Sequence, residues 1–163
     1  MSRKLVLLSF LVSLIALAMA DVLPQGSQTE AQFLQHGQKL TQQYDYAAAL
    51  KILNLGLTQY PKSAVLIAEF KKDSELYILH EISQGYQSID KNIHDVSAYI
   101  RVSNAWFLAN ETFKAFEVLL DGTAENQTSA SLWVAIGNLE ELSGRPAEAH
   151  AAFEEAKRYE SVN

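Results

Sequence analysis

The sequence predicts an all-α fold, and three observations support this prediction. Apolar and small residues recur at helical spacing from about residue 30 onward, for example at Phe33, Gly37 and Leu40. Similar sets of large and small residues return on a grid of about 34 residues, a period typical of proteins built from repeated helix pairs. The chain has no cysteine among its 163 residues, so its core is expected to form by helix packing without disulfides.

The repeat is clearest in the last segment and in the first. In the last segment the recurring positions are Trp133, Ile136, Gly137, Gly144, Ala149, Phe153 and Ala156. In the first segment, about residues 30–62, they are Phe33, Gly37, Asp45, Tyr46, Ala49, Leu53, Gly56 and Pro61. This order resembles the tetratricopeptide repeat (TPR) family. The resemblance implies a TPR-like helical-hairpin solenoid of three to four repeats, whose stacked helix pairs form a binding surface rather than a catalytic cleft.

The first repeat is expected to consist of two helices. The first helix covers about residues 30–43, where Gly37 lets the partner helix approach closely. A glycine inside a helix costs roughly 1 kcal/mol relative to alanine, and close packing offsets this cost. Asp45 is expected to cap the second helix. Pro61 is expected to end the pair, because proline disfavours helical geometry in the preceding residue.

The second segment, about residues 63–95, departs from the pattern. Its apolar helical face is formed by Val65, Leu66, Ile67, Phe70, Leu76, Tyr77, Leu79 and Ile82. No glycine or proline occurs where the turn inside the repeat would fall, and Gly85 is the first residue that interrupts the helical pattern. The sequence therefore leaves two alternatives open, namely two short helices or one long helix ending near Gly85.

The third and fourth repeats are in phase with each other. Asn110 stands in the third repeat where Gly144 stands in the fourth, so both are expected at the turn between two helices. Thr128 or Ser129 is expected to cap the first helix of the fourth repeat. Pro146 is expected to open the second helix of that repeat, where proline is well tolerated.

Residues 1–20 have the order of a secretory signal peptide: a basic start, an apolar run and a small-residue cleavage motif that ends at Ala20. We therefore expect cleavage after Ala20, a flexible leader over residues 21–29 and a TPR-like helical domain over residues 30–163. The apolar run is short for a membrane span, which needs roughly 20 apolar residues, so an uncleaved anchor is the less favoured alternative. The resulting prediction is an exported protein, periplasmic or secreted, with no stable membrane anchor.

The charge of the chain argues against two classes of partner. Removal of residues 1–20 lowers the number of Lys plus Arg from 13 to 11 against 19 Asp plus Glu, so the net charge of the remaining chain is −8. Acidity of this size disfavours binding to nucleic acid and to anionic lipid surfaces. The expected partner is therefore a protein or peptide, and a basic or neutral one is favoured.

The sequence carries no pattern that is typical of an enzyme active site. It lacks a nucleophile elbow, a phosphate-binding glycine loop and the paired-histidine zinc motif. Asp90 with His94, and His150 with Glu154, stand four residues apart, but two ligands do not complete a metal site. We therefore expect no enzymatic activity, no metal site and no cofactor.

The resemblance also implies which residues face the inner groove in which TPR proteins hold a partner. Arg101 and Asn104 take such positions in the third repeat, and Asn138 and Glu141 take them in the fourth. A side-chain amide both donates and accepts hydrogen bonds, so Asn104 and Asn138, one repeat apart, are suited to hold a peptide backbone. TPR proteins that grip a terminal carboxylate add lysine and arginine beside such asparagines, and here only Arg101 fits that role.

The last helix suggests a second contact surface. Ala152 and Tyr159 fall on its apolar face, and part of that face is expected to lack a covering helix. An exposed apolar patch usually marks an interaction site, so we expect a homodimer or a partner contact through this C-terminal interface. The function predicted from the sequence is an exported protein-binding scaffold or assembly factor that holds a partner segment in its groove. The alternative is a structural subunit of a fixed envelope or secretory complex.

Overall fold

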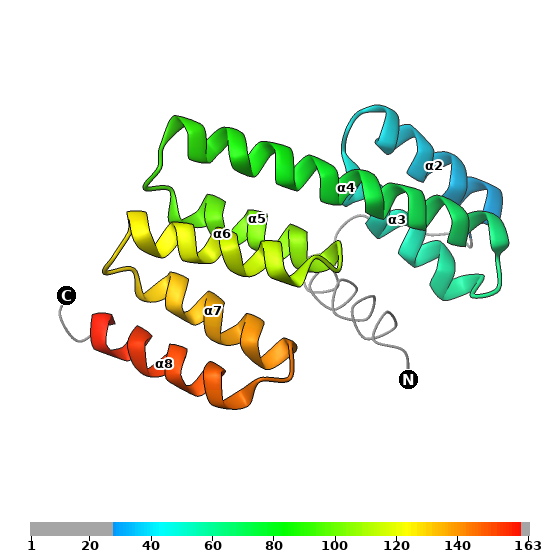
Figure 1. Ribbon diagram of the computed structural model, residues 1–163. Helices are drawn as coiled ribbons and strands as arrows, with labels where there is room; N and C mark the ends of the chain where they lie inside the picture. The colour runs from blue at the N-terminus through cyan, green and yellow to red at the C-terminus, as the bar shows by residue number, and fades with distance from the viewer. Residues whose placement is uncertain (1–27, 161–163) are drawn as a thin grey trace. The chain divides into compact units, whose positions relative to one another are not determined.

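The computed structural model describes residues 28–160, and every regular element in this range is an α-helix. The helices, labelled as in Figure 1, are α2 (Glu30–Gln42), α3 (Tyr46–Gln59), α4 (Ala64–Lys91), α5 (Val96–Leu108), α6 (Thr112–Glu125), α7 (Ala130–Leu142) and α8 (Pro146–Glu160). Short turns join α2 to α3, α5 to α6 and α7 to α8, and each of these pairs packs as a hairpin. The predicted all-α, TPR-like helical-hairpin fold is thereby confirmed.

The predicted signal peptide and most of the predicted leader lie outside the described residues. The description begins just before α2, where Thr29 caps the helix. The Thr29 hydroxyl accepts a hydrogen bond from the Gln32 N–H at 3.3 Å, and the Gln32 side chain accepts one from the Thr29 N–H at 2.7 Å. This reciprocal capping box satisfies two N–H groups that have no partner inside the helix. Across residues 28–160, no helix has both the length and the apolar composition that crossing a membrane requires.

The chain divides into two compact units, and the division falls within α4, between Tyr77 and Ile78. In the first unit, α2, α3 and the start of α4 enclose a core made of Phe33, Leu50, Leu53, Leu66 and Phe70. Gly37 permits the expected close approach of α3, because a Cβ at this position would lie 2.7 Å from Cδ2 of Leu53. Asp45 caps α3 as predicted, since its carboxylate accepts a hydrogen bond from the Ala48 N–H at 3.1 Å.

α4 is one continuous helix of 28 residues, and this settles the alternatives that the sequence left open. The helix continues past Gly85 and ends at Lys91, so the glycine does not terminate it. The starts of α2, α4, α5 and α7 stand at residues 30, 64, 96 and 130, and the interval that contains α4 is two residues shorter than the other two. This repeat therefore lacks residues for an internal turn, and its two helices are fused into one.

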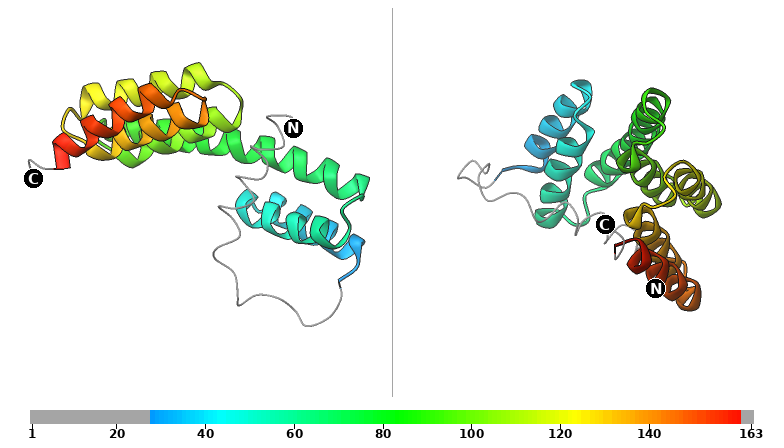
Figure 2. Two further views of the ribbon diagram at one scale, coloured as in Figure 1. Left: turned by 90° about the horizontal axis from the view of Figure 1, so that it is seen from below. Right: turned by 90° about the vertical axis from the view of Figure 1, so that its left-hand side faces the viewer.

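In the second unit, the hairpins α5–α6 and α7–α8 lie side by side (Figure 2). Their shared core consists of Tyr99, Val102, Ala115, Val118, Leu119, Leu132, Ile136, Leu139 and Ala152. Asn110 and Gly144 form the two hairpin turns with φ values of 65° and 78°. This left-handed region is open to glycine and, among other residues, best tolerated by asparagine. The prediction that Asn110 takes the place of the turn glycine is therefore confirmed.

Small residues mark the closest helix contacts of this unit. A Cβ at Gly137 on α7 would lie 2.4 Å from Cε1 of Phe153 on α8, and Ala149 is fully buried beside it on α8. A Cβ at Gly85 on α4 would lie 2.1 Å from Cγ2 of Val102 on α5. The first contact confirms the packing that the repeat grid predicts. The second gives Gly85 a role that the sequence did not reveal, namely the approach of α5 to α4.

Candidate protein-binding surface

The two asparagines of the predicted groove lie on α5 and α7, which contact each other within the second unit. Asn104 and Asn138 are both exposed, and each follows a buried small residue, Ser103 or Gly137, that faces the core. The repeat phase thus places the two amides at equivalent positions on neighbouring helices. Together they present four N–H donors and two carbonyl acceptors of hydrogen bonds on neighbouring helices.

The two charged residues predicted for this surface have different surroundings. Arg101 is half-buried, and its Nη2 donates a hydrogen bond to the Ser88 hydroxyl of α4 at 3.3 Å. A guanidinium carries five N–H donors, so this contact orients Arg101 and leaves further donors for a ligand. Glu141 is exposed one turn beyond Asn138 on α7. The surface therefore combines uncharged amides with one charge of each sign.

The C-terminal helix differs from the sequence expectation. Ala152 is only 4% exposed and belongs to the core of the second unit, and Tyr159 is half-buried. None of the exposed large apolar side chains within residues 28–160 lies on α8. Ala149, Ala152 and Ala156 of α8 are buried, and its outer face carries ion pairs such as Lys157–Glu154 at 2.6 Å. The expected uncovered apolar patch is therefore absent from this face of α8.

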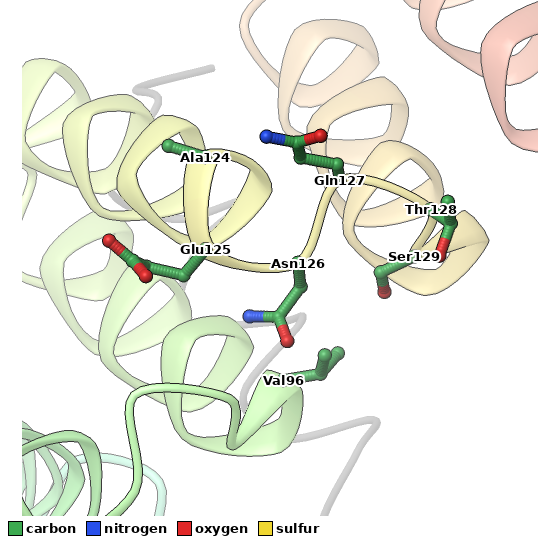
Figure 3. A pocket seen from close by; sticks show the side chains of 7 residues that line it. All are labelled: Val96, Ala124, Glu125, Asn126, Gln127, Thr128 and Ser129. Atoms are coloured by element: carbon green, nitrogen blue, oxygen red, sulfur yellow. The ribbon is translucent and has the colours of Figure 1, made fainter.

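A shallow depression of about 440 Å³ lies at the loop between α6 and α7 (Figure 3). It is lined by Val96, Ala124, Glu125, Asn126, Gln127, Thr128 and Ser129. The Asn126 amide points toward Val96 at the start of α5 and donates hydrogen bonds to the carbonyls of Gly122 at 3.1 Å and Ile93 at 3.5 Å. These bonds hold the loop against the α4–α5 connection, so Asn126 has a structural role at this site.

Histidines and carboxylates of residues 28–160 form no cluster of three or more that could hold a metal ion. His94, which the sequence pairs with Asp90, has another contact in the structure. Its Nδ1 lies 3.0 Å from the carbonyl oxygen of Glu125, in the same loop contact as Asn126. This contact between His94 and the Glu125 carbonyl links the loop between α4 and α5 to the end of α6.

A buried carboxylate on α4 was not foreseen from the sequence. Asp73 is 0% exposed, and its Oδ2 accepts a hydrogen bond from the Thr41 hydroxyl of α2 at 2.7 Å, while its Oδ1 has no hydrogen-bond partner. Burial raises the pKa of the Asp73 carboxyl above its usual range, the Thr41 hydrogen bond opposes this rise, and the nearby Glu69 adds to it. The position continues the buried spacing of Leu66 and Phe70, and this spacing is the signal by which it could have been found.

Comparisons with known proteins give structural neighbours only. No protein-family model matches the sequence, and no curated protein matches it. The chain is similar to TTC0263, a thermophilic TPR protein in Thermus thermophilus, with 19% identity, a TM-score of 0.48 and coverage of 82% of this chain and 75% of that one. It is also similar to MamA of MSR-1, with 13% identity, a TM-score of 0.45 and coverage of 98% of both chains. A structure of MamA from AMB-1 gives 13% identity and a TM-score of 0.43 over 99% of this chain and 93% of that one.

Proposed function

We propose that this chain is an exported protein-binding scaffold or assembly factor that holds a segment of a partner protein across α5 and α7. The observation that supports the proposal is the exposure of Asn104 and Asn138 at equivalent positions of two contacting helices. A peptide backbone offers alternating donors and acceptors, and side-chain amides match both. Two amides one repeat apart therefore suit a segment that is held by its main chain. Arg101 and Glu141 supply charges that select among such segments.

The test begins with a photo-crosslinking residue placed at Asn138 and, as a control, at His150 on the exposed side of α8. A partner held on α5 and α7 is expected to crosslink from position 138 and not from position 150, with the crosslinked peptide identified by mass spectrometry. Asn104→Ala with Asn138→Ala should then weaken binding of that peptide at least tenfold, since each lost hydrogen bond to a buried backbone group costs roughly 1–3 kcal/mol.

The matched control is Gln84→Ala, which removes an exposed side-chain amide on α4 in the same unit. It should leave the affinity within about twofold, because surface substitutions away from a site usually change free energies by less than about 0.5 kcal/mol. Circular dichroism of all three proteins should show the same helix content. Equal affinity of the double variant and the parent would place the binding surface elsewhere.

Export is the part of the proposal that rests on residues 1–20 alone. The full chain, expressed with a secretion-competent host, is expected to yield a product whose intact mass corresponds to a first residue at Asp21, because the small-residue motif before it suits signal peptidase. The control is a chain with Ala20→Lys, which should retain the uncleaved mass. A wild-type product that keeps Met1 and leaves the membrane only in detergent would contradict export by cleavage.

A further inference from the structure

Half of the exposed large apolar side chains of residues 28–160 lie on two helices of the second unit and in the turn that follows the first of them. We define the outer surface by these side chains, which are Leu79 and Tyr86 of α4, Ile93 of the turn after α4, and Phe113 and Leu120 of α6. Phe113 is 73% exposed and Tyr86 is 41% exposed. Exposed apolar groups in such a concentration usually mark an interaction site rather than a tolerated surface. The inner pair of asparagines lies on other helices, so this surface is separate from the one proposed above.

The apolar side chains of the outer surface form two rows with the same spacing. Leu79 and Tyr86 on α4, like Phe113 and Leu120 on α6, stand seven residues apart, which corresponds to about 10.5 Å of helix rise. Leu79 and Phe113, like Tyr86 and Leu120, are one repeat of about 34 residues apart. The second half of α4 and α6 run in the same direction (Figure 1). The two rows are therefore in register, as expected for equivalent helices of successive repeats.

One member of each row, Tyr86 and Leu120, lines a depression of about 400 Å³ between α4 and α6, whose other lining residues are Lys114, Glu117, Val118 and Asp121. Tyr86 is held in place there, because its hydroxyl accepts a hydrogen bond from Nε1 of Trp106 on α5 at 3.3 Å. The face of the Trp106 ring carries the Lys114 ammonium at 4.4 Å from its centroid. These contacts hold the Tyr86 side chain in one orientation in the unbound protein. A side chain that is already ordered lowers the entropy cost of binding.

The charges around the depression are mostly negative. Glu117 and Asp121 line it, and Asp90 lies one helical turn after Tyr86 on α4, exposed like both of them. Lys114, the lysine of the lining, is already paired with Glu111 at 3.6 Å and with the Trp106 ring. A partner that covers this surface therefore meets uncompensated carboxylates beside the apolar rows. Opposite charge on the partner would be attracted, and like charge would be repelled.

We propose that the outer surface between α4 and α6 docks an amphipathic α-helix of a partner protein, with apolar residues on one face and basic residues beside them. The rise of about 10.5 Å between side chains of one row equals seven residues of a partner helix. An extended strand repeats one face every two residues, about 6.6–6.8 Å, and does not match the rows. The acidic rim selects lysine or arginine at the flanks of the partner helix.

The test uses a fluorescent synthetic peptide of about three heptads, with leucine at the heptad core positions and lysine at the flanking positions. A second peptide carries glutamate in place of every lysine. Fluorescence anisotropy with the full chain is expected to show micromolar binding of the lysine peptide and at least tenfold weaker binding of the glutamate peptide. Binding of the lysine peptide should weaken as salt rises, because exposed charges are screened.

Variants locate the site. Phe113→Ser and Leu120→Ser remove exposed apolar groups from the outer surface. Each is expected to weaken binding of the lysine peptide at least fivefold without changing the melting temperature of the protein. The matched control, Val65→Ser with Ile67→Ser, removes two exposed apolar groups from the first turn of α4 in the other unit and should leave the affinity within twofold. Amide NMR shifts on peptide addition should be confined to α4 from Leu79 onward and to α6.

Four results would overturn the inference. The first is that the lysine peptide does not bind at about 1 mM, and the second is that both peptides bind equally at low salt. The third is that the Phe113→Ser variant and the parent bind the lysine peptide equally. The fourth is that the peptide shifts amide NMR signals of α5 and α7 instead of those of α4 and α6. A fifth result would change which molecule covers the outer surface. If sedimentation shows a dimer of this chain that Phe113→Ser dissociates, the outer surface joins two copies and does not receive a partner helix.

Discussion

Gly85→Ala is expected to destabilise the chain by up to about 2 kcal/mol, because overpacking a filled contact usually costs about 1–3 kcal/mol and the higher helix propensity of alanine returns up to about 1 kcal/mol. The added Cβ would lie 2.1 Å from Cγ2 of Val102, a side chain that is 0% exposed. Valine is branched at Cβ and cannot swing its methyl group away without changing its preferred rotamer. This cost outweighs the gain of up to about 1 kcal/mol that alanine brings to a helix in place of glycine. Urea unfolding followed by circular dichroism measures the difference.

Two further variants test this prediction. One is a control, and the other tests whether the clash with Val102 is the reason for the destabilisation. Gln84→Ala changes the neighbouring exposed residue and should leave the unfolding free energy nearly unchanged. Val102→Ala is expected to destabilise the parent, because the substitution leaves a cavity. The same substitution should cost less stability in the Gly85→Ala background, because there it also removes the clash with the added Cβ. A Gly85→Ala protein that is more stable than the parent would mean that α4 and α5 do not approach at this residue.

Asp73→Asn is expected to stabilise the chain at pH 8 by about 1–3 kcal/mol, the range associated with a buried polar group that lacks a partner. The Thr41 hydroxyl has one proton but two acceptors in reach, the Gly37 carbonyl at 3.1 Å and Asp73 at 2.7 Å. A neutral side chain that donates to Thr41 frees the Thr41 proton for Gly37, so both bonds form at once. Asparagine can donate in this way at every pH, whereas aspartate must first be protonated.

The pH dependence of this effect follows from the raised pKa of Asp73. A carboxyl whose pKa is higher in the folded than in the unfolded chain binds more protons when folded. Its contribution to stability is therefore fully present below the unfolded pKa, near about 3.9, and is lost as the pH rises through the folded pKa. The advantage of Asp73→Asn should thus be small at pH 4 and grow toward pH 8. Asp90→Asn, which changes an exposed carboxylate of the same helix, serves as the control.

Urea unfolding of the three proteins at several pH values tests this expectation. The difference between Asp73→Asn and the parent isolates Asp73 from other carboxylates such as Glu69. Burial disfavours the charged form of Glu69, but hydrogen bonds from Lys72 and Gln38 outweigh it and lower the pKa of that group. A parent that is more stable than Asp73→Asn at pH 8, or a difference that does not change with pH, would contradict a raised pKa of Asp73 in the folded chain.

The hairpins could be predicted from the sequence because their signals are local. Asp45 caps α3, Asn110 and Gly144 make the turns, and Pro146 opens α8, each at the predicted residue. Gly85 misled the prediction for α4, because a glycine ends a helix only when nothing else stabilises it there. Here the close approach of Val102 favours a residue without a Cβ inside the helix. A glycine can end a helix or can allow another helix to pack closely against it. Which of the two occurs depends on a neighbouring helix that the local sequence does not contain.

The candidate sites were predicted less completely than the fold. The repeat phase placed Asn104 and Asn138 on equivalent helix positions, and both are exposed. The apolar face of α8 was predicted correctly, but its coverage was not: alanines 149, 152 and 156 are all buried, and small residues alone do not show how much of a helix face is covered. Asp73 was missed because a charged residue in a helix is normally assigned to solvent. Its burial depends on the packing of α2 against α4, which spacing within one helix indicates only weakly.

The absence of a turn in α4 also bears on the order in which the chain folds. The two cores share no residue, yet α4 contributes Leu66 and Phe70 to one of them and Ile89 to the edge of the other. Starting a helix is slow and unfavourable, whereas lengthening an existing one adds a hydrogen bond for each residue fixed. Whichever core condenses first therefore leaves a helix end from which the remainder of α4 can grow. The second core then starts from an existing template, so one nucleation event serves both parts of the chain.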